Sequence, residues 1–336
     1  SVVGYVDFTV QINIKLLGFL VLMTFIYQYL NCFTMKNRKI NNVALFVLIA
    51  CTSCGQKQSD KNLKEDQAIA NTKLSDSESE NKSLKDIIDT SGMTLQKRIN
   101  VPDGFMRTEA LETSFTSHLR NLPLKKHGSL VRMHDGQYKA NDNVYDAVID
   151  LPIGKRDLHQ CADAIMRLRA EWLWKNKRYS EIHFNFTSGW RCDYSEWMKG
   201  KRVKLINGKP TWIQSKPASN TPQDLWSYLE LIFTYAGTLS LSRELVKIPL
   251  SQLEVGDVFI KGGSPGHAVL ISDMAVNTST GEKIFLLMQS YMPAQEIQLL
   301  KNNDNPKLSP WYSEKQAAML STPEWDFTGN QLMRFK

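Results

Sequence analysis

The sequence predicts a single α+β domain, in which helices come first and an antiparallel meander of strands follows. Two segments, 157–177 and 221–235, carry helix-start signals followed by apolar residues at helical spacing. Three strand-like segments come after them, at 257–261, 267–276 and 283–291, and the polar turn NTSTGEK joins the last two. This order favours an α+β fold over an alternating α/β fold.

Shorter elements are predicted ahead of and between the two long helices. Leu111, Phe115 and Leu119 form one apolar stripe at helical spacing, so a helix is expected over residues 108–122. Apolar runs predict three strands, over 130–133, 144–151 and 182–186. No repeat and no second linker interrupts this stretch, which predicts one continuous domain over residues 91–336.

Capping residues mark the starts of the two long helices. Asp157 is the expected N-cap of the first, and Gln160 completes a capping-box pattern. Thr221–Pro222 begins the second, because proline has no N–H to lose at the first helical position. With Asp157 as the N-cap, Cys161 occupies the fourth helical position and its N–H is bonded within the helix. Only a start nearer His159 or Gln160 would leave that N–H free.

The front of the chain carries an export pattern. From Met35, basic residues precede a short apolar run that ends in Leu48-Ile49-Ala50-Cys51, which is the order of a bacterial lipoprotein signal peptide over residues 35–50. Cys51 is then the lipidated residue of the mature N-terminus. Cys54 is the weaker candidate, and an ordinary signal peptide is the alternative.

Two flanking segments complete this organisation. Residues 1–34 are expected to be an upstream extension, because their apolar run at 16–30 is shorter than the ~20 residues of a membrane helix; a genuine extra anchor is the minority interpretation. Residues 51–90 are polar and charged, without one aromatic residue or proline. Such a composition buries too little apolar surface to fold, which predicts a flexible tether.

Composition narrows the class of protein. Hydrophobic residues make up 42% of the chain, and all eight tryptophans fall between Trp172 and Trp325, which places the core in the C-terminal part. The net charge is +7, and four basic residues against one acidic residue in 1–50 account for +3 of it. The remainder has no concentrated basic block, so we expect no nucleic-acid binding. We also expect no cofactor.

A cysteine near a helix start and a later histidine on a strand are the candidate catalytic groups. A thiol attacks as a thiolate, so its pKa must fall, and a helix N-terminus and a neighbouring histidine both lower it. Cys161 is the predicted nucleophile and His267, after the run GGSPG, the predicted base. Gln289 is the first choice for orienting the imidazole, and Ser290 is the alternative, because a one-residue slip exchanges them.

Several alternatives stay open for these residues. Cys161 and Cys192 lie in one exported domain, where two cysteines are typical of a disulfide. Cys161 could also be an inert core thiol, with Asp163 nearby raising its pKa, and His267 a structural histidine. His159 shares a helix face with Asp163, but a solvated face explains the pair better than a metal site does.

The segment NFTSGWRCDYSEWMKGKR, residues 185–202, is rich in aromatic and polar side chains. Trp190, Tyr194 and Trp197 could form a stacking surface for sugar rings, with Arg191 beside them. The alternative is that these aromatics are partial core beneath a loop. The sequence therefore predicts a candidate substrate-binding surface here and leaves the alternative open.

Two resemblances add to these interpretations. The segments DLHQCADAIMRLRAEWLW, FNFTSG, GDVFIKGGSPGHAVLISDMA, MQSYMPAQEIQ and TPEW resemble an uncharacterised bacterial lipoprotein family, domain of unknown function 4846. LEVGDVFI followed by GHAVLI is similar to the strand–turn–histidine core of NlpC-type and CHAP-type papain-like hydrolases. The second resemblance implies a papain-like fold that cleaves peptide or amide bonds of the bacterial cell wall, with Cys161 as nucleophile, His267 as general base and Gln289 as orienter.

These observations lead to two functional expectations. The first is an exported lipoprotein, anchored in the bacterial cell envelope and facing outside the cytoplasm, that acts as a cysteine hydrolase or transferase on peptide or amide bonds, including those of peptidoglycan. The second is a non-catalytic envelope lipoprotein that binds glycan or peptide and has a structural Cys161–Cys192 disulfide. The state of the Cys161 sulfur separates the two.

Overall fold

The computed structural model describes residues 87–336, and every structural statement below concerns those residues. The predictions for residues 1–34, for the signal peptide at 35–50, for Cys51 and for most of the tether lie outside them. Within the described part, no helix combines the length and the apolar character needed to cross a membrane.

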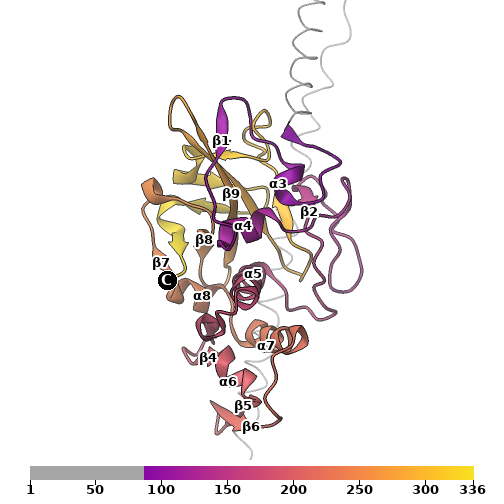
Figure 1. The fold of residues 1–336 in the computed structure, drawn as a ribbon, viewed down its shortest axis with the longest axis vertical. Coiled ribbons are helices and arrows are strands. Elements are labelled where there is room, and N and C mark those ends of the chain that lie inside the picture. The colour runs from indigo at the N-terminus through magenta and orange to yellow at the C-terminus, as the bar shows by residue number, and fades with distance from the viewer. Residues whose placement is uncertain (1–86) are drawn as a thin grey trace, which may run out of the picture. The chain divides into compact units, whose positions relative to one another are not determined.

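The described chain is a mixed α+β domain (Figure 1). Its helices are α3 (Leu95–Arg98), α4 (Phe115–Arg120), α5 (Cys161–Lys175), α6 (Tyr194–Met198), α7 (Pro222–Tyr235) and α8 (Thr238–Glu244). Helix α7 has the predicted bounds, because Thr221 caps it and Pro222 is its first residue. The predicted helix over 108–122 shortens to α4, which Ser114 caps by accepting from Ser117 N–H.

A nine-stranded antiparallel sheet forms the centre of the domain. Its main path runs β2, β11, β10, β9, β8, β15, β7, while β1 pairs with β9 and β12 pairs with β10. The strands are β1 (Phe105–Arg107), β2 (Tyr145–Val148), β7 (Val246–Lys247), β8 (Val258–Lys261), β9 (His267–Asn277), β10 (Lys283–Gln289), β11 (Gln298–Leu300), β12 (Tyr312–Ser313) and β15 (Leu332–Arg334). The predicted meander is β8–β9–β10, and it is confirmed as three neighbouring antiparallel strands.

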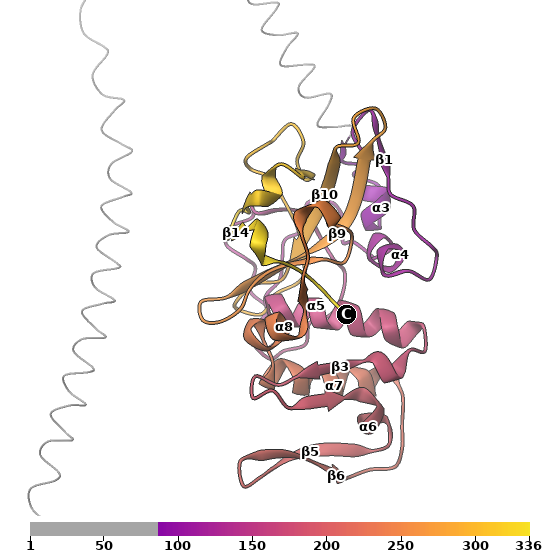
Figure 2. The same cartoon turned by 90° about the vertical axis from the view of Figure 1, so that its left-hand side faces the viewer.

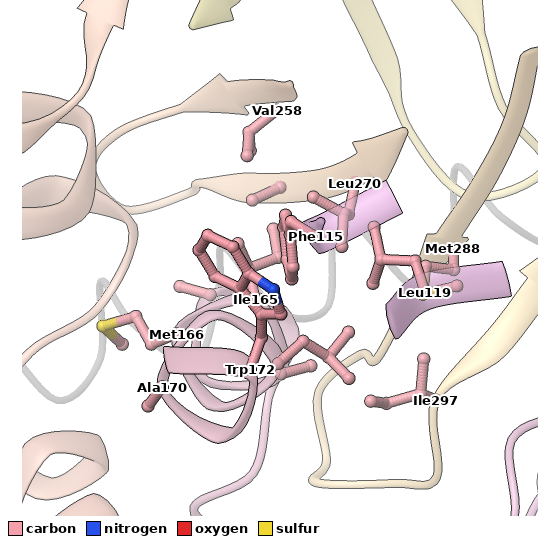
Figure 3. Packing of buried hydrophobic residues seen from close by; sticks show 14 of the residues in the cluster. Phe115, Leu119, Ile165, Met166, Ala170, Trp172, Val258, Leu270, Met288 and Ile297 are labelled. Atoms are coloured by element: carbon pink, nitrogen blue, oxygen red, sulfur yellow. The ribbon is translucent and has the colours of Figure 1, made fainter. Parts of the chain in front are cut away.

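Alternation along these strands gives the sheet two apolar faces. Ala268 and Leu270 of β9 belong to the cluster that contains α5, whereas Val269 and Ile271 belong to a second cluster on the other face. Both faces are therefore covered, and β9 and β10 read as nearly continuous apolar runs for this reason. Figure 3 shows the first cluster, in which Trp172 of α5 gathers with residues of α4 and of the sheet.

Three two-stranded ribbons lie outside the large sheet. They are β3 (His183–Asn185) with β4 (Arg191–Asp193), β5 (Lys201–Ile206) with β6 (Lys209–Gln214), and β13 (Met319–Ser321) with β14 (Asp326–Thr328). In Figure 2 α5 runs beneath the sheet, β3 and α7 lie beyond it, and the β5–β6 ribbon lies farther out. The chain between α5 and α7 therefore forms an outer layer on the far side of α5 from the sheet.

Helix α5 begins later than the capping pattern predicts. Gln160 is its N-cap, and the Asp163 carboxylate accepts from the Gln160 N–H at 3.0 Å. The predicted N-cap, Asp157, instead accepts from the Ala294 N–H at 2.7 Å and from the Gln160 side-chain amide at 3.1 Å. Asp157 is thus occupied by a segment distant in sequence, and Cys161 becomes the first helical residue.

One predicted strand is wrong. Residues 130–133 contain only isolated bridges, of Arg132 to Tyr138 and of Met133 to Gln295, and no strand. Each bridge stands alone, so no ladder forms here. The other short strand predictions are confirmed with trimmed ends, as β2 and β3.

Candidate active site

Cys161 occupies the N-terminal end of α5, where it is partly exposed. Because the first N–H groups of a helix have no partner inside it, the Cys161 N–H makes no bond within α5. Burial and the nearby Asp163 raise the pKa of the thiol from its ordinary 9.0 to about 11. The N–H groups of Ala162 and Ala268 act in the opposite direction and lower it. Burial outweighs them, and the thiol is neutral at pH 7.

His267 is the first residue of β9, and Gln289 is the last residue of β10. His267 Nε2 and Gln289 Oε1 lie 2.7 Å apart, which is a hydrogen bond. The alternative orienter, Ser290, is turned away and donates to the carbonyl oxygens of His159 and Gln295. The register of the hairpin therefore sets Gln289 against the imidazole and leaves Ser290 outside that contact.

A polar chain extends from Gln289 to residues that the sequence did not single out. Gln289 Nε2 donates to Glu324 Oε2 at 2.6 Å. Lys139 Nζ in turn donates to both carboxylate oxygens of Glu324, at 2.7 and 2.8 Å. Glu324 lies in the turn between β13 and β14, within the TPEW motif, which suggested the family resemblance but carried no chemical assignment.

Aromatic rings enclose the imidazole. The centroid of the His267 ring lies 4.9 Å from that of Tyr291, 5.4 Å from that of Trp325 and 6.0 Å from that of Phe327. Burial among these rings lowers the pKa of His267 to about 4, against a smaller opposing effect of the Gln289 hydrogen bond. The imidazole is consequently neutral at pH 7.

Cys161 and His267 open into one cavity of about 490 Å³. Its walls come from the start of α5, the link between α7 and α8, the 263–266 turn before β9, and the residues Tyr291, Met292 and Trp325. Apart from His267 no basic side chain lines it, whereas Asp157 and Asp163 both do. Thiol and imidazole are both neutral, and no hydrogen bond joins them in the described structure.

Asp163 is the least satisfied polar group of this cavity. Its Oδ1 is buried and has no hydrogen-bond partner, while Oδ2 accepts from Gln160. Burial raises the pKa of the carboxyl from 3.8 to about 8, with the Gln160 hydrogen bond opposing the change. Asp163 is therefore largely protonated at pH 7, which removes a negative charge from beside Cys161.

Cys192 has no part in the cavity. It lies in β4 opposite Phe184, is fully buried, and burial raises its pKa well above the ordinary value. Cys161 and Cys192 are both free thiols, so the disulfide that the sequence left open is not formed between them.

The predicted stacking surface in the 185–202 segment needs correction. Tyr194 is fully buried and Trp197 is 6% exposed, and both rings pack edge-on against Tyr228. Trp190 is partly buried against Trp212, and Arg191 is held at the surface by Asp193. Tyr194 and Trp197 therefore belong to the core, which is the alternative that the sequence left open, whereas Trp190 and Arg191 keep exposed surface.

The described residues hold no group of three or more His, Cys, Asp and Glu side chains placed to bind a metal ion. His159, the residue weighed as a ligand, is fully buried, with Nε2 3.5 Å from Arg167 Nη1. Burial, reinforced by Arg167, lowers the pKa of His159 to about 3, so its ring is a neutral core group.

Comparison with known proteins adds one match. The family model described as Domain of unknown function (4846) matches residues 95–334. No curated protein and no solved structure matches the chain. The matched residues include every side chain of the cavity and of the polar chain behind it.

Proposed function

We propose that this chain, which belongs to the family described as Domain of unknown function (4846), is a cysteine-dependent hydrolase or transferase acting on peptide or amide bonds. The observation that carries the proposal is the shared cavity: Cys161 at the first residue of α5 and His267 at the first residue of β9 both open into it. A nucleophile, a base and an orienting group for the base are the three parts that covalent acyl transfer needs.

The arrangement of α5 against β8–β10 supports a papain-like, NlpC-type core as the finer fold assignment. In such a core a cysteine begins a helix, a histidine lies on a following strand, and an orienting side chain lies on the next strand. Cys161, His267 and Gln289 occupy these three places in chain order, on α5, β9 and β10.

The reaction follows from the hydrogen bonds. Because His267 Nε2 faces Gln289 Oε1, it carries the proton, and Nδ1 is the free acceptor of the ring. Nδ1 takes the proton of the Cys161 thiol while the sulfur attacks the amide carbon, and the Cys161 N–H donates to the resulting oxyanion. The C–N bond then breaks as the imidazolium gives its proton to the leaving amine. Water completes hydrolysis of the thioester, and an acceptor amine in its place completes transfer.

The neutral state of the Cys161 thiol and the His267 imidazole determines when the proton moves. A thiol pKa of about 11 and an imidazole pKa of about 4 do not favour a preformed thiolate–imidazolium pair. Proton transfer must therefore accompany attack on a bound substrate. Hydrogen bonds of this kind are often long in an empty site and shorten when substrate is bound.

The lining of the cavity indicates the kind of substrate. It includes the Asp157 carboxylate and no lysine or arginine, so a neutral or cationic peptide fits better than an anionic group. Lipidation at Cys51 would place the domain in the cell envelope, where peptidoglycan supplies peptide amides. The anchor and this location rest on the sequence of residues 35–51 alone.

The test uses the full protein with a digest of peptidoglycan peptides. Wild-type protein and the Cys192→Ala variant are expected to cleave or exchange an amide bond, seen by mass spectrometry of the products. Cys161→Ala should lose the reaction, and His267→Ala should slow it by about 10²- to 10⁴-fold, the usual contribution of a general base. Acid quenching should trap a thioester on Cys161.

Two outcomes would reject the proposal. One is amide cleavage that persists in Cys161→Ala. The other is saturable binding of the peptides with no cleavage or thioester in wild-type protein, which would make this a binding domain that uses the same cavity. Cys192→Ala controls for the loss of a thiol that the structure places outside the site.

A further inference from the structure

We propose that Glu324, held by Lys139, is a positioning residue that sets the tautomer of His267 through Gln289. The inference deepens the proposed function and rests on it for its catalytic consequence. Neither Glu324 nor Lys139 belongs to the helix–strand–strand arrangement of Cys161, His267 and Gln289, and the two lie 185 residues apart in sequence.

The first step concerns the two ends of the Gln289 amide. A glutamine can present either its oxygen or its NH₂ group to a neighbour, so by itself it does not dictate which imidazole nitrogen carries the proton. An ionised carboxylate only accepts hydrogen bonds. Because Glu324 Oε2 lies 2.6 Å from Gln289 Nε2, the NH₂ end faces Glu324 and Oε1 faces His267.

The second step concerns the imidazole. An oxygen 2.7 Å from His267 Nε2 requires that nitrogen to carry a proton. In a neutral ring the proton on Nε2 leaves Nδ1 as the acceptor, which is the state that the proposed proton transfer needs. A flipped Gln289 amide would favour the other tautomer, in which Nδ1 carries the proton and cannot take one from the thiol.

Lys139 pairs with both carboxylate oxygens of Glu324. The ammonium group donates to both carboxylate oxygens, and its side chain is 8% exposed against 16% for that of Glu324. A carboxylate in such a partly buried place needs a paired charge. The positive charge of Lys139 also lowers the pKa of His267. This effect is smaller than those of burial and of the Gln289 hydrogen bond.

The turn that carries Glu324 is itself fixed. Thr322 N–H donates to the Trp325 carbonyl oxygen at 2.9 Å, and Trp325 N–H donates to Thr322 Oγ1 at 3.1 Å. Trp325 lies against the His267 ring and lines the cavity. One short turn thus places both the anchor of the polar chain and a wall of the cavity.

The test uses substitutions that keep side-chain size. Glu324→Gln replaces the carboxylate by an amide, so Gln289 can take either orientation and both tautomers of His267 should be populated. The exchange double variant, Gln289→Glu with Glu324→Gln, puts a carboxylate against His267 and an amide behind it, which should restore the single Nε2–H tautomer. Glu282→Ala, which removes a surface partner of Lys315, is the control.

The primary readout is nitrogen NMR of the histidine ring in the full protein, which reports the tautomer without any substrate. In the amide assay, Glu324→Gln should lower kcat by about 10- to 100-fold, the usual loss for a partner one step behind a reacting group, with little change in KM. The exchange variant should recover most of that loss. Glu282→Ala should match wild type in both measurements.

Two results would overturn the inference: an unchanged single tautomer in Glu324→Gln, or a mixed tautomer that the exchange does not restore. Failure of the proposed function looks different, because wild-type protein would then cleave no amide while Glu324→Gln still altered the tautomer. A lowered melting temperature with an unaltered ring spectrum would assign Glu324 a purely structural role.

Discussion

The thiol of Cys161 lies under opposing electrostatic influences. The N–H groups at the start of α5 stabilise a negative sulfur, whereas burial and Asp163 destabilise it, and the thiol pKa of about 11 shows which side prevails. The sulfur is therefore held in its neutral, weakly nucleophilic form. In the proposed reaction, a bound substrate that offers a carbonyl carbon would change this balance by making proton transfer and attack a single event.

Asp163 should make the protein less stable as pH rises. Its carboxyl pKa is about 8 in the folded chain and near 3.8 when unfolded, so between these values the folded state binds the extra proton. The unfolding free energy then falls as pH rises from 4 to 8, by up to about 1.4 kcal/mol per unit. Asp163→Asn cannot titrate, and urea unfolding across this range should show a flatter dependence for it.

The control for this measurement is Asp326→Asn, which changes an exposed carboxylate of β14. It should keep the wild-type slope. An Asp163→Asn protein whose pH dependence equals that of wild type would show that the carboxyl is ionised in the folded state, and that its charge opposes the Cys161 thiolate at neutral pH.

Among the elements, β9 carries the anchor for two of its neighbours. The buried Asp273 accepts from Arg107 of β1 and from Arg120 of α4, each at 2.6 Å. Asp273→Asn leaves two guanidinium groups without their carboxylate, and we expect a loss of about 3–5 kcal/mol in the free energy of unfolding. Denaturant titration measures it. Asp193→Asn, which breaks the surface pair with Arg191, should cost less than about 1 kcal/mol.

Equal losses in these two variants would contradict the assignment of Asp273 as a buried anchor. A small loss in Asp273→Asn alone would mean that water reaches the guanidinium groups when the carboxylate is absent. Either result would mean that the contacts of Asp273 with β1 and α4 contribute little to the stability of the fold.

The sequence predicted elements whose signals are local. Helix α7 was placed within a residue because Thr221 and Pro222 set its start by themselves, and β8–β10 were found from their apolar runs and turns. The start of α5 was misplaced because Asp157 is claimed by the N–H of Ala294, a long-range partner that no local pattern reveals. The strand predicted at 130–133 was wrong because the segment makes only isolated bridges, of Arg132 to Tyr138 and of Met133 to Gln295, which do not extend into a ladder.

The candidate site divides in the same way. His267 and Gln289 lie on adjacent strands of one hairpin, so the order of the strands was enough to suggest that they meet. It did not decide between Gln289 and Ser290, because a one-residue change of register exchanges them. Glu324 and Lys139 reach the site from loops far apart in the chain, and only the fold brings them together. Composition left the aromatics of residues 190–197 undecided between surface and core, because a tryptophan-rich segment has the same composition in either place. Tyr194 and Trp197 lie in the core.

At the scale of the whole molecule, the two described cysteines bear on the alternative in which a Cys161–Cys192 disulfide is structural. Cys161 lies at the cavity, whereas Cys192 is sealed in the outer layer, where Tyr228 donates to its carbonyl oxygen at 2.8 Å. Peptide mapping of native protein under non-reducing conditions should find both as thiols. Because burial raises the thiol pKa, alkylation of Cys161 should be slow at pH 7 and quicken toward pH 10.

Cys192 should react only after the protein unfolds, because its side chain is inaccessible in the folded state. In native protein Cys161 should therefore be labelled faster than Cys192, and in denaturant the two rates should become equal. The ratio of the rates measures how far the layer outside α5 stays folded. A disulfide-linked peptide pair of Cys161 and Cys192 would reject the role of Cys161 as nucleophile. It would also reject its place in the cavity, since the sulfur would then lie away from His267 at the start of β9. Labelling of both residues at equal rates in native protein would instead show that the outer layer opens without the sheet.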